Sequence, residues 1–428
     1  MNKGYLAALV RGLCIDLTGK PHFVISEDGS VQAPSAQTPG EIPAGAMRAA
    51  ISAGENSANA PLADVPLADA AEIIRAAYMS WKAENCLGAV CGAENGKVPL
   101  PSCVALCDKG AAWALFRVGG DFDSARKRLG EKNALPLIES AAESSPVIKP
   151  EQRAEVVKNR ITLVTGGAQG IGEEIVRNLA AAGAVVCIAD LNIEGAQKLA
   201  DDINAAEKRT AVLAITVNVA DEASVEAMIN TVAEKTGGLD LCVSNAGVLR
   251  AGSVLEQELA DFKFVTDINY TGFFIISKFA GRLLRAQHAA APRWKTDIIQ
   301  INSKSGLEGS NKNGAYAGGK FGGVGLVASY ALELIEYNIK VNAVCPGNFL
   351  DGPLWSHPEK GLFVQYLTTG KVPGAKTVAD VRAFYEAKVP MKRGCAGKDL
   401  MRAIYYLVEQ EYETGQAVPV TGGQVMLH

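Results

Sequence analysis

Apolar residues follow a regular pattern over most of the chain after residue 158. Short apolar runs alternate there with longer stretches in which apolar residues recur at the spacing of a helix. Runs such as 161–165, 184–190 and 298–301 have the length of buried strands, and an alanine-rich stretch typical of a helix follows the first. Strands that alternate with helices form a parallel sheet covered on both faces. The pattern therefore predicts an α/β domain over residues 151–428.

The first third of the chain shows less periodicity. Residues 32–66 are rich in Ala, Pro, Gly and Ser, which predicts a long loop or a partly disordered segment. Two apolar runs on either side of Asp108-Lys-Gly110 predict a β-hairpin. Apolar spacing over 67–83 and 122–142 predicts two helices, and a linker should follow the second. We therefore expect a smaller α+β accessory domain over residues 1–150.

Composition and charge narrow the class of protein. The net charge is −4 and the signs are intermixed, which argues against a nucleic-acid surface. No apolar run reaches the ~18 residues that span a membrane. The apolar patch near residue 1 is interrupted by Arg11, unlike a signal peptide. We therefore expect a cytoplasmic protein that binds a small-molecule substrate and has no nucleic-acid or membrane partner.

The nine cysteines predict core residues rather than disulfides or a metal site. Several, such as Cys187, Cys242 and Cys345, lie inside apolar runs, where reduced cysteine behaves as a small hydrophobic residue. The four cysteines between residues 86 and 107 have no histidine among them and lack the spacing of a zinc site. No metal is therefore expected.

A glycine-rich segment follows the first apolar run directly. In Gly166-Gly-Ala-Gln-Gly170-Ile-Gly172, the glycines permit a tight turn, close approach of a pyrophosphate, and close packing of helix on strand. The start of the helix would offer free N–H groups to the phosphates. Asp190, about 20 residues further on, suits a ribose 2′-hydroxyl and would repel a 2′-phosphate. These residues predict a Rossmann-type site for NAD. Alternatively, Asp190 only caps the following helix.

A second group of residues predicts proton transfer. Lys320 follows Tyr316 by one helical turn, so the two side chains share a face. A phenol has a pKa near ~10, and a nearby ammonium is expected to lower it, which would make Tyr316 a general base. Ser303 lies in the loop after the run 298–301, where its hydroxyl could orient the substrate oxygen.

These motifs, in this order, resemble the short-chain dehydrogenase/reductase family over about 158–428. Ser244-Asn-Ala-Gly247 is similar to its motif after the fourth strand, and Thr421-Gly-Gly423 to its C-terminal signature. The resemblance implies a Rossmann-type doubly wound sheet of seven parallel strands in the order 3-2-1-4-5-6-7, with NAD as cofactor. It implies catalytic roles for Asn269, Ser303, Tyr316 and Lys320. The cofactor-binding residues that it implies are Gly166, Gln169, Gly170, Ile171, Gly172, Asp190, Asn218, Val219, Asn245, Ala246, Gly247, Tyr316, Lys320, Pro346 and Gly347.

Within the family, segments 299–306, 320–326, 388–395 and 420–426 resemble the sorbitol-6-phosphate 2-dehydrogenase branch. This implies NAD-dependent interconversion of a polyol phosphate and a keto-sugar phosphate, most simply sorbitol 6-phosphate and fructose 6-phosphate. Residues 350–388, where the family has its substrate lid with Trp355 and His357, depart from that branch. The expected substrate contacts are Ser303, Lys304, Tyr316 and Asn348. The candidate cations for a phosphate are Lys304, Lys312, Lys392 and Arg393.

Other functions are compatible with the same motifs. A dehydrogenase of an unphosphorylated polyol, or a ketone reductase, needs the same residues. A catalytically silent NAD(H)-sensing regulator normally lacks the Tyr316 or Lys320 equivalent, and both are present. The family commonly forms tetramers, so a homotetramer or homodimer is expected. The N-terminal third resembles a degenerate class II aldolase-like domain, but with His22 as its single histidine it keeps no aldolase metal site, which favours an interaction module.

Overall fold

A seven-stranded sheet forms the centre of the computed structural model. The strands are all parallel, in the order β9-β8-β7-β10-β11-β12-β13, which is the predicted order 3-2-1-4-5-6-7. The strands are β7 (Ile161–Thr165), β8 (Val185–Asp190), β9 (Val212–Thr216), β10 (Leu241–Ser244), β11 (Thr296–Ile301), β12 (Ile339–Pro346) and β13 (Ala417–Val420). The structure describes residues 3–18, 23–26, 47–50, 67–85, 97–100, 103–108, 111–119, 122–127, 137–140, 150–359, 361–368, 370 and 372–426.

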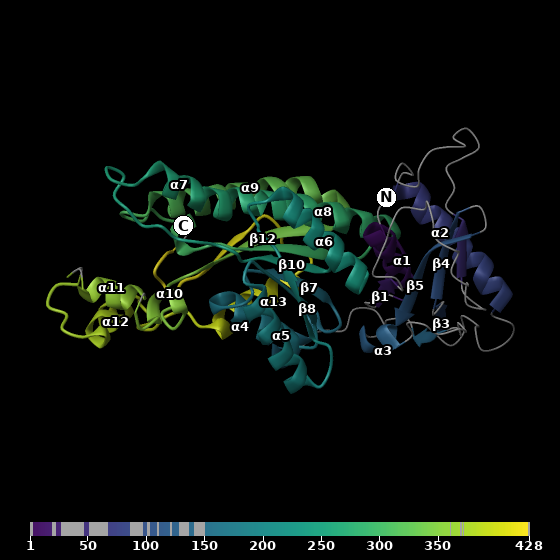
Figure 1. Ribbon diagram of the computed structural model, residues 1–428, viewed down its shortest axis with the longest axis horizontal. Coiled ribbons are helices and arrows are strands. Elements are labelled where there is room, and N and C mark those ends of the chain that lie inside the picture. Colours follow the sequence, from purple (N-terminus) through teal and green to yellow (C-terminus); the bar gives the residue numbers. More distant parts are fainter. Residues whose placement is uncertain are drawn as a thin grey trace.

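Helices cover both faces of this sheet (Figure 1). One face is covered by α6 (Glu222–Thr236), α8 (Gly272–Ala290) and α9 (Gly314–Leu334), and the other by α4 (Gly170–Ala181), α5 (Ile193–Glu207) and α13 (Gly397–Glu409). The shorter elements are η3 (Pro150–Val157), α7 (Leu259–Thr266), η4 (Asp267–Thr271), η5 (Lys304–Gly306), η6 (Ile335–Tyr337), α10 (Pro353–Ser356), α11 (Leu362–Thr368) and α12 (Val378–Ala387). Among the described helices, none is long and apolar enough to span a bilayer.

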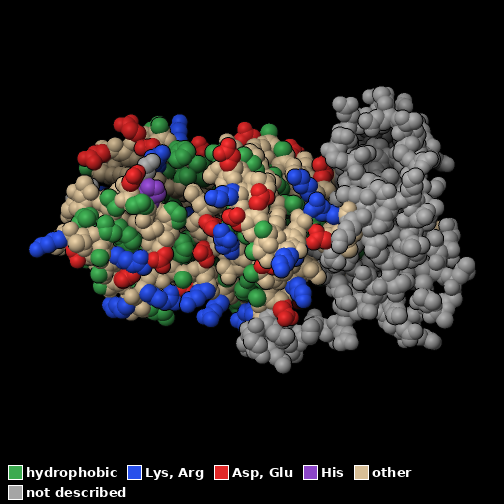
Figure 2. Space-filling model, turned by 60° about the horizontal axis from the view of Figure 1, so that its bottom comes forward, with side chains coloured by type: hydrophobic (Ala, Val, Ile, Leu, Met, Phe, Trp, Pro, Cys, Tyr) green, Lys and Arg blue, Asp and Glu red, His purple; other side chains and the backbone are tan. Residues whose placement is uncertain are grey.

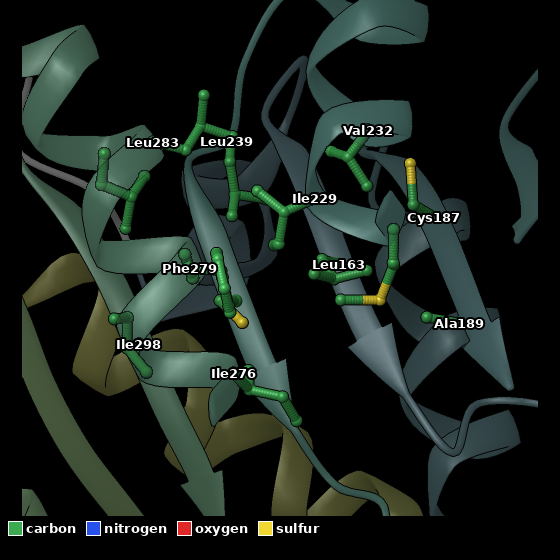
Figure 3. Packing of buried hydrophobic residues seen from close by; sticks show 14 of the residues in the cluster. Leu163, Cys187, Ala189, Ile229, Val232, Leu239, Ile276, Phe279, Leu283 and Ile298 are labelled. Atoms are coloured by element: carbon green, nitrogen blue, oxygen red, sulfur yellow. The ribbon is translucent and has the colours of Figure 1, made fainter. Parts of the chain in front are cut away.

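The core consists of two layers, one on each face of the sheet. Because successive side chains of a strand point to opposite faces, Leu163 of β7 packs against α6 and α8, while its neighbour Val164 packs against α4 and α13. Figure 3 shows part of the first layer, where Phe279 of α8 lies among other buried apolar side chains. Strands buried on both faces explain the continuous apolar runs in the sequence.

The described residues before 150 form a smaller mixed sheet with helices, at the opposite end of the molecule from α10–α12 (Figure 1). Four strands pair in the order β1-β5-β4-β2, and β3 pairs with β6. The elements are α1 (Lys3–Thr18), β1 (Phe23–Ser26), β2 (Met47–Ala50), α2 (Leu67–Asn85), β3 (Lys97–Leu100), β4 (Cys103–Asp108), β5 (Ala111–Gly119), α3 (Phe122–Lys127) and β6 (Leu137–Ser140). Over the face in Figure 2, acidic and basic side chains are scattered together on the described residues.

The sequence predicted some of these N-terminal elements and missed others. The helix expected over 67–83 is α2, and the expected hairpin is the antiparallel pair β4–β5. The helix expected over 122–142 is wrong, because α3 ends at Lys127 and residues 137–140 pair with β3 as a strand. Most of 32–66 lies outside the described residues, but β2 within it is a strand that pairs with β4. Strands β2 and β6 pair with segments that are distant in the sequence, and local composition cannot reveal such partners.

A buried ion pair joins α1 to the large sheet. Arg11 and Asp240, both fully buried, are 2.7 Å apart, and Asp240 also accepts hydrogen bonds from Ile161 N (2.8 Å) and Trp294 Nε1 (2.9 Å). Burial alone would raise the pKa of Asp240, but the charges of Arg11 and Arg160 and the hydrogen bonds from Arg11 and Ile161 hold it below its ordinary value. Arg11 also donates to Gln287 of α8 (2.9 Å). The first helix is therefore bonded to the amino ends of β7 and β10.

Candidate active site

The glycine turn lies between β7 and α4 and requires its glycines. Gly166 and Gly170 have φ values of +63° and +61°, in the left-handed region that favours glycine. A Cβ on Gly166 would lie 2.8 Å from Ala246 Cα, and one on Gly172 would lie 2.0 Å from the Gly166 carbonyl oxygen. Gln169 is the N-cap of α4, and its side chain makes no capping hydrogen bond to the first N–H groups of the helix.

Asn245, at the end of the neighbouring strand β10, supports this turn. Its Nδ2 donates to the carbonyl oxygens of Thr165 (3.0 Å) and Gly166 (2.9 Å). The backbone N–H groups of Asn245 and Ala246 donate to Thr165 Oγ1, at 3.1 and 3.2 Å. The Asn245 amide therefore holds the ends of β7 and β10 together beside the turn.

Asp190 lies at the end of β8, against the same turn. Its Oδ2 accepts a hydrogen bond from Ala168 N (3.0 Å) and its Oδ1 accepts one from Asn192 N (2.9 Å). The N-cap of α5 is Asn192, which accepts from Gly195 N, so Asp190 is not the cap of that helix. Further along, Asn218 is exposed and accepts from Ala220 N (3.1 Å), whereas Val219 is buried in the core. The carboxylate is thus fixed by two backbone N–H groups that leave it beside the glycine turn.

Ser303, Tyr316 and Lys320 come together at the carboxyl end of β11. Lys320 is 5% exposed, and its Nζ donates to the Ile301 carbonyl (2.9 Å) and lies 5.6 Å from the centre of the Tyr316 ring. The Ser303 side chain hydrogen-bonds with Tyr316, and its Oγ accepts from Ser305 N (3.1 Å) as the N-cap of η5. The structure therefore brings the three side chains together: Tyr316 is bonded to Ser303, and the Lys320 ammonium lies near its ring.

The pKa values of this group differ from the expectation. Burial raises the pKa of Tyr316, and the hydrogen bond from Ser303 offsets only part of that effect. The expected lowering of this pKa is therefore wrong, because desolvation disfavours the phenolate more than the hydrogen bond from Ser303 favours it. Burial also lowers the pKa of Lys320 from 10.5 to about 8. The ammonium is still mostly charged at neutral pH, but at a cost in free energy.

Asn269 lies in the π-helical turn η4, between α7 and α8. It is 3% exposed and exchanges two hydrogen bonds with the Val248 backbone, each of 2.8 Å. A Cβ on Gly247 would lie 3.1 Å from Asn269 Oδ1 and 3.8 Å from Lys320 Nζ. The Gly247 backbone thus passes close to both side chains. Single π-turns inside helices are frequent at functional sites, and this one places Asn269 beside the lysine.

Pro346, Gly347 and Asn348 lead from β12 towards the last strand. Gly347 N donates to the Val420 carbonyl (2.9 Å), and a Cβ on Gly347 would lie 2.6 Å from Gln424 Oε1. Asn348 accepts at its carbonyl from Cys395 N (2.9 Å). These backbone bonds fix the start of the following segment, which contains α10, α11 and α12.

The segment with α10, α11 and α12, which we call the lid, has a small core of its own. Trp355 is buried there, with its ring centre 4.8 Å from that of Tyr385 and 5.2 Å from that of Phe363. A Cβ on Gly170 would lie 3.5 Å from Pro353 Cδ, so the first lid helix lies over the glycine turn. His357 accepts at Nδ1 from Glu359 N (3.2 Å), which is a local turn contact.

Three of the four candidate phosphate cations have partners already. Lys304 Nζ lies 2.9 Å from Oε1 of Glu308, four residues further along the chain, and Lys392 Nζ donates to the Ala387 carbonyl (2.8 Å). Arg393 binds both oxygens of Asp399, at 2.5 and 3.0 Å. Lys312 has a left-handed backbone, with φ of +55°. Within the ranges given above, no group of three or more His, Cys, Asp or Glu could hold a metal ion.

One buried polar residue at the site was not singled out from the sequence. Asn302 lies between the end of β11 and Ser303, is 3% exposed, and bonds to both Ser303 and Lys320. The signal in the sequence is weak: an asparagine interrupts the apolar run just before the candidate serine.

Known proteins similar to this chain share the fold and the site region. The sequence profile of the short chain dehydrogenase family matches residues 160–357. The sorbitol-6-phosphate 2-dehydrogenase of Escherichia coli (strain K12) is 36% identical over 271 residues, which are 63% of this chain and 99% of that protein. The meso-2,3-butanediol dehydrogenase of Serratia marcescens is 31% identical and covers 56% of this chain and 96% of its own length.

A solved structure of a similar protein has the same fold. The crystal structure of sorbitol-6-phosphate 2-dehydrogenase from Erwinia amylovora superposes with a TM-score of 0.57 at 39% identity, over 62% of this chain and 100% of that one. The order of the strands, the glycine turn and the relatives matched over nearly their whole length point to one conclusion. The chain belongs to the short-chain dehydrogenase/reductase family of oxidoreductases.

Proposed function

We propose that this chain is an NAD-dependent dehydrogenase that interconverts a polyol phosphate with a keto-sugar phosphate, most simply sorbitol 6-phosphate with fructose 6-phosphate. The observation that carries the proposal is the cluster of Ser303, Tyr316 and Lys320 at the carboxyl end of β11. The substrate class is taken from the relatives named sorbitol-6-phosphate 2-dehydrogenase, which this chain matches over almost their full length.

The glycine turn fits a dinucleotide. Any Cβ at Gly166 or Gly172 would clash with backbone, so the turn keeps a concave backbone surface at the start of α4, where a pyrophosphate can accept hydrogen bonds. Asp190, held by Ala168 N and Asn192 N, would accept hydrogen bonds from the adenosine ribose. Its charge would repel a 2′-phosphate, which supports NAD over NADP. Asn218, Val219, Ala246, Pro346 and Gly347 would line the rest of the cofactor site.

The reaction would use the trio for proton transfer. NAD, when bound, supplies the acceptor for the hydride that leaves the alcohol carbon. Tyr316 would accept the hydroxyl proton as general base, and Ser303 would hold the reacting oxygen by a hydrogen bond. Lys320 would stabilise the phenolate through its charge and bind the nicotinamide ribose. Asn269, bonded to Val248 beside Lys320, would keep the path by which the proton reaches solvent.

A second candidate is a dehydrogenase of an unphosphorylated polyol or diol. The specific observation in its favour is that Lys304 is paired with Glu308 and Arg393 with Asp399, so these cations are already neutralised. One relative is named as a meso-2,3-butanediol dehydrogenase. Binding of a sugar phosphate would require Lys304 to exchange Glu308 for the phosphate, with Asn348 at the other side of the substrate.

The two candidates are separated by NADH oxidation at neutral pH. Fructose 6-phosphate, fructose and buffer alone are each added to the chain with NADH, and absorbance is followed. Consumption with the phosphate and not with fructose supports the first candidate, and the reverse supports the second. The Lys304→Ala variant should raise KM for the phosphate far more than for the free sugar. An equal change for both would remove Lys304 from the substrate site.

We also propose a homo-oligomer, a tetramer or a dimer. Helices α7, α8 and α9 carry exposed apolar side chains, which a second copy could cover. They are Phe262, Phe264, Phe274, Phe321 and Leu332, with exposed fractions of 46%, 42%, 44%, 46% and 83%. In size-exclusion chromatography with light scattering, Leu332→Asp should shift the chain to a smaller species. Met79→Asp, at an exposed position of α2 outside these three helices, is the control that should leave the mass unchanged.

A further inference from the structure

We propose that Asn302 is a positioning residue that fixes the position of Ser303 relative to Lys320. This inference rests on the proposed dehydrogenase function. Asn302 Nδ2 donates to the backbone carbonyl of Lys320 (2.9 Å), and Asn302 Oδ1 accepts from the backbone N–H of Ser303 (2.8 Å). One amide side chain therefore connects the strand end that carries the serine to the helix that carries the lysine.

Lys320 is held at two points by consecutive residues of β11 and its extension. Its Nζ donates to the Ile301 carbonyl (2.9 Å), and its own carbonyl accepts from Asn302. The first bond fixes the ammonium, and the second fixes the part of α9 from which the side chain extends. Because Tyr316 lies one turn earlier on α9, the same bond also sets the distance of the phenol from Ser303.

Two glycines leave room for this amide. A Cβ on Gly306 would lie 2.2 Å from Asn302 Oδ1, and a Cβ on Gly323 would lie 3.1 Å from Asn302 Nδ2 and 2.6 Å from Gln300 Nε2. Gln300 supplies a second acceptor, since Asn302 Nδ2 donates to its Oε1 at 2.7 Å. Because Gly306 and Gly323 lack side chains, η5 and α9 can pack closely against the end of β11.

The partners of Asn302 require an uncharged amide. One side must accept from an N–H and the other must donate to carbonyl oxygens, which neither a carboxylate nor an apolar side chain can do. Removing the amide leaves the part-buried Ser303 N–H and the buried Lys320 carbonyl without this partner, so the loop and helix are free to shift. A displacement of ~1 Å of catalytic groups reduces turnover by about 10²-fold.

The test compares Asn302→Ala with Asn342→Ala. Asn342 is an equally buried asparagine on β12 whose side chain also makes two backbone bonds, to Glu413 O (3.0 Å) and from Gln416 N (2.9 Å), away from the trio. For the alcohol that the wild-type chain oxidises fastest, Asn302→Ala should lower kcat by about 10²-fold, while Asn342→Ala changes it by less than about threefold. Equal losses in both variants, or no loss in Asn302→Ala, would overturn the proposal.

The Asn302→Asp variant tests the two halves of the contact. It keeps an acceptor for Ser303 N–H but turns an oxygen towards the Lys320 carbonyl, so turnover should stay as low as in Asn302→Ala. Recovery of wild-type turnover would remove Lys320 from the proposal.

A readout without turnover separates this inference from the proposed function. The pKa of Lys320 can be followed by NMR of ¹³C-methylated lysines, with the resonance assigned from a Lys320→Arg sample. It should rise towards the ordinary lysine value in Asn302→Ala, because the part of α9 that carries Lys320 is free to shift, and stay at the wild-type value in Asn342→Ala. If the wild-type chain oxidises no alcohol, the proposed function fails. An unchanged resonance in Asn302→Ala would instead reject the positioning role.

Discussion

Lys320 is buried, and the half-buried Tyr316 lies one helical turn before it on α9. Burial raises the pKa of the phenol and lowers that of the amine, so both charged forms are less favourable here than in water. Residues whose pKa values are displaced in this way are concentrated at catalytic sites. The arrangement suits a proton that moves only when the substrate hydroxyl lies against Tyr316.

Tyr316→Phe is the direct test of this role. The variant keeps the ring and loses the hydroxyl, so turnover should fall by at least ~10²–10⁴-fold, while the affinity for NADH, measured by fluorescence, changes little. Because the pKa of Tyr316 is raised, wild-type oxidation of the alcohol should increase with pH above neutrality. Turnover in Tyr316→Phe close to that of the wild-type chain would contradict the assignment.

Lys320→Met should make the protein inactive and more stable. Keeping the buried ammonium charged below pH 8 costs about 3 kcal/mol, from a pKa shift of 10.5 to about 8. Loss of the bond to Ile301 offsets part of this, so we expect a net gain of about 1–2 kcal/mol at pH 7. Between pH 8 and 10.5 the folded protein releases this proton and the unfolded chain keeps it, so wild-type stability rises with pH.

Urea unfolding at pH 7 and at pH 9.5 measures this effect. The difference between Lys320→Met and the wild-type chain should be larger at pH 7 than at pH 9.5. A variant that is less stable than the wild-type chain at pH 7 would show that the lysine contributes favourable packing rather than a desolvation cost.

Several site residues could be predicted from the sequence because their chemistry follows from local spacing. The glycine turn and the Tyr316–Lys320 pair depend on a few neighbouring positions, and the pairing of Lys304 with Glu308 could also have been predicted from its helical spacing. The raised pKa of Tyr316 could not, because burial depends on residues brought in by other elements. Asn302 was missed for the same reason, since its partner Lys320 is on another element.

Among the helices and strands too, those with a local sequence pattern could be predicted, and those that depend on distant partners could not. Strands β7 to β12 have apolar runs because helices cover both faces of the sheet, and this pattern is visible in the sequence. In contrast, β2 and β6 are short strands whose backbone partners are the distant β4 and β3. Their residues have no strong strand preference, so tertiary pairing overrides the local pattern, and the expected helix over 122–142 ended early.

Helix α1 provides a prediction about the junction between the N-terminal part and the sheet. Arg11→Met would leave the buried Asp240 carboxylate without its main counter-charge, so the free energy of unfolding should fall by about 3–5 kcal/mol. Arg177→Met on α4 is the control, because its pair with Glu173 is exposed and worth less than about 1 kcal/mol. Urea titration measures the free energy of unfolding of both variants. Equal losses would show that the Arg11–Asp240 pair stabilises the fold no more than an exposed ion pair does.

At the scale of the whole molecule, the N-terminal elements and the candidate active site lie at opposite ends of the sheet. Arg11 bonds to Asp240, just before β10, whereas Ser303, Asn245 and Gly347 follow the carboxyl ends of their strands. Ala8 of α1 and Phe122 of α3 belong to the same buried cluster as Phe279 of α8. The N-terminal helices and strands that the structure describes therefore pack against the large sheet at the end away from Ser303, Asn245 and Gly347.

A fragment of residues 151–428 should separate these two contributions. Without α1, Asp240 loses its counter-charge and part of the α8 surface loses its cover, so the fragment should unfold at a lower urea concentration than the full chain. The glycine turn, Asp190 and Lys320 do not contact α1, so any folded fragment should bind NADH with the affinity of the full chain. Equal stability of the fragment and the full chain would mean that the α1 contacts contribute nothing to folding. Weaker binding of NADH by the folded fragment would instead indicate that the N-terminal part influences the cofactor site from the far end of the sheet.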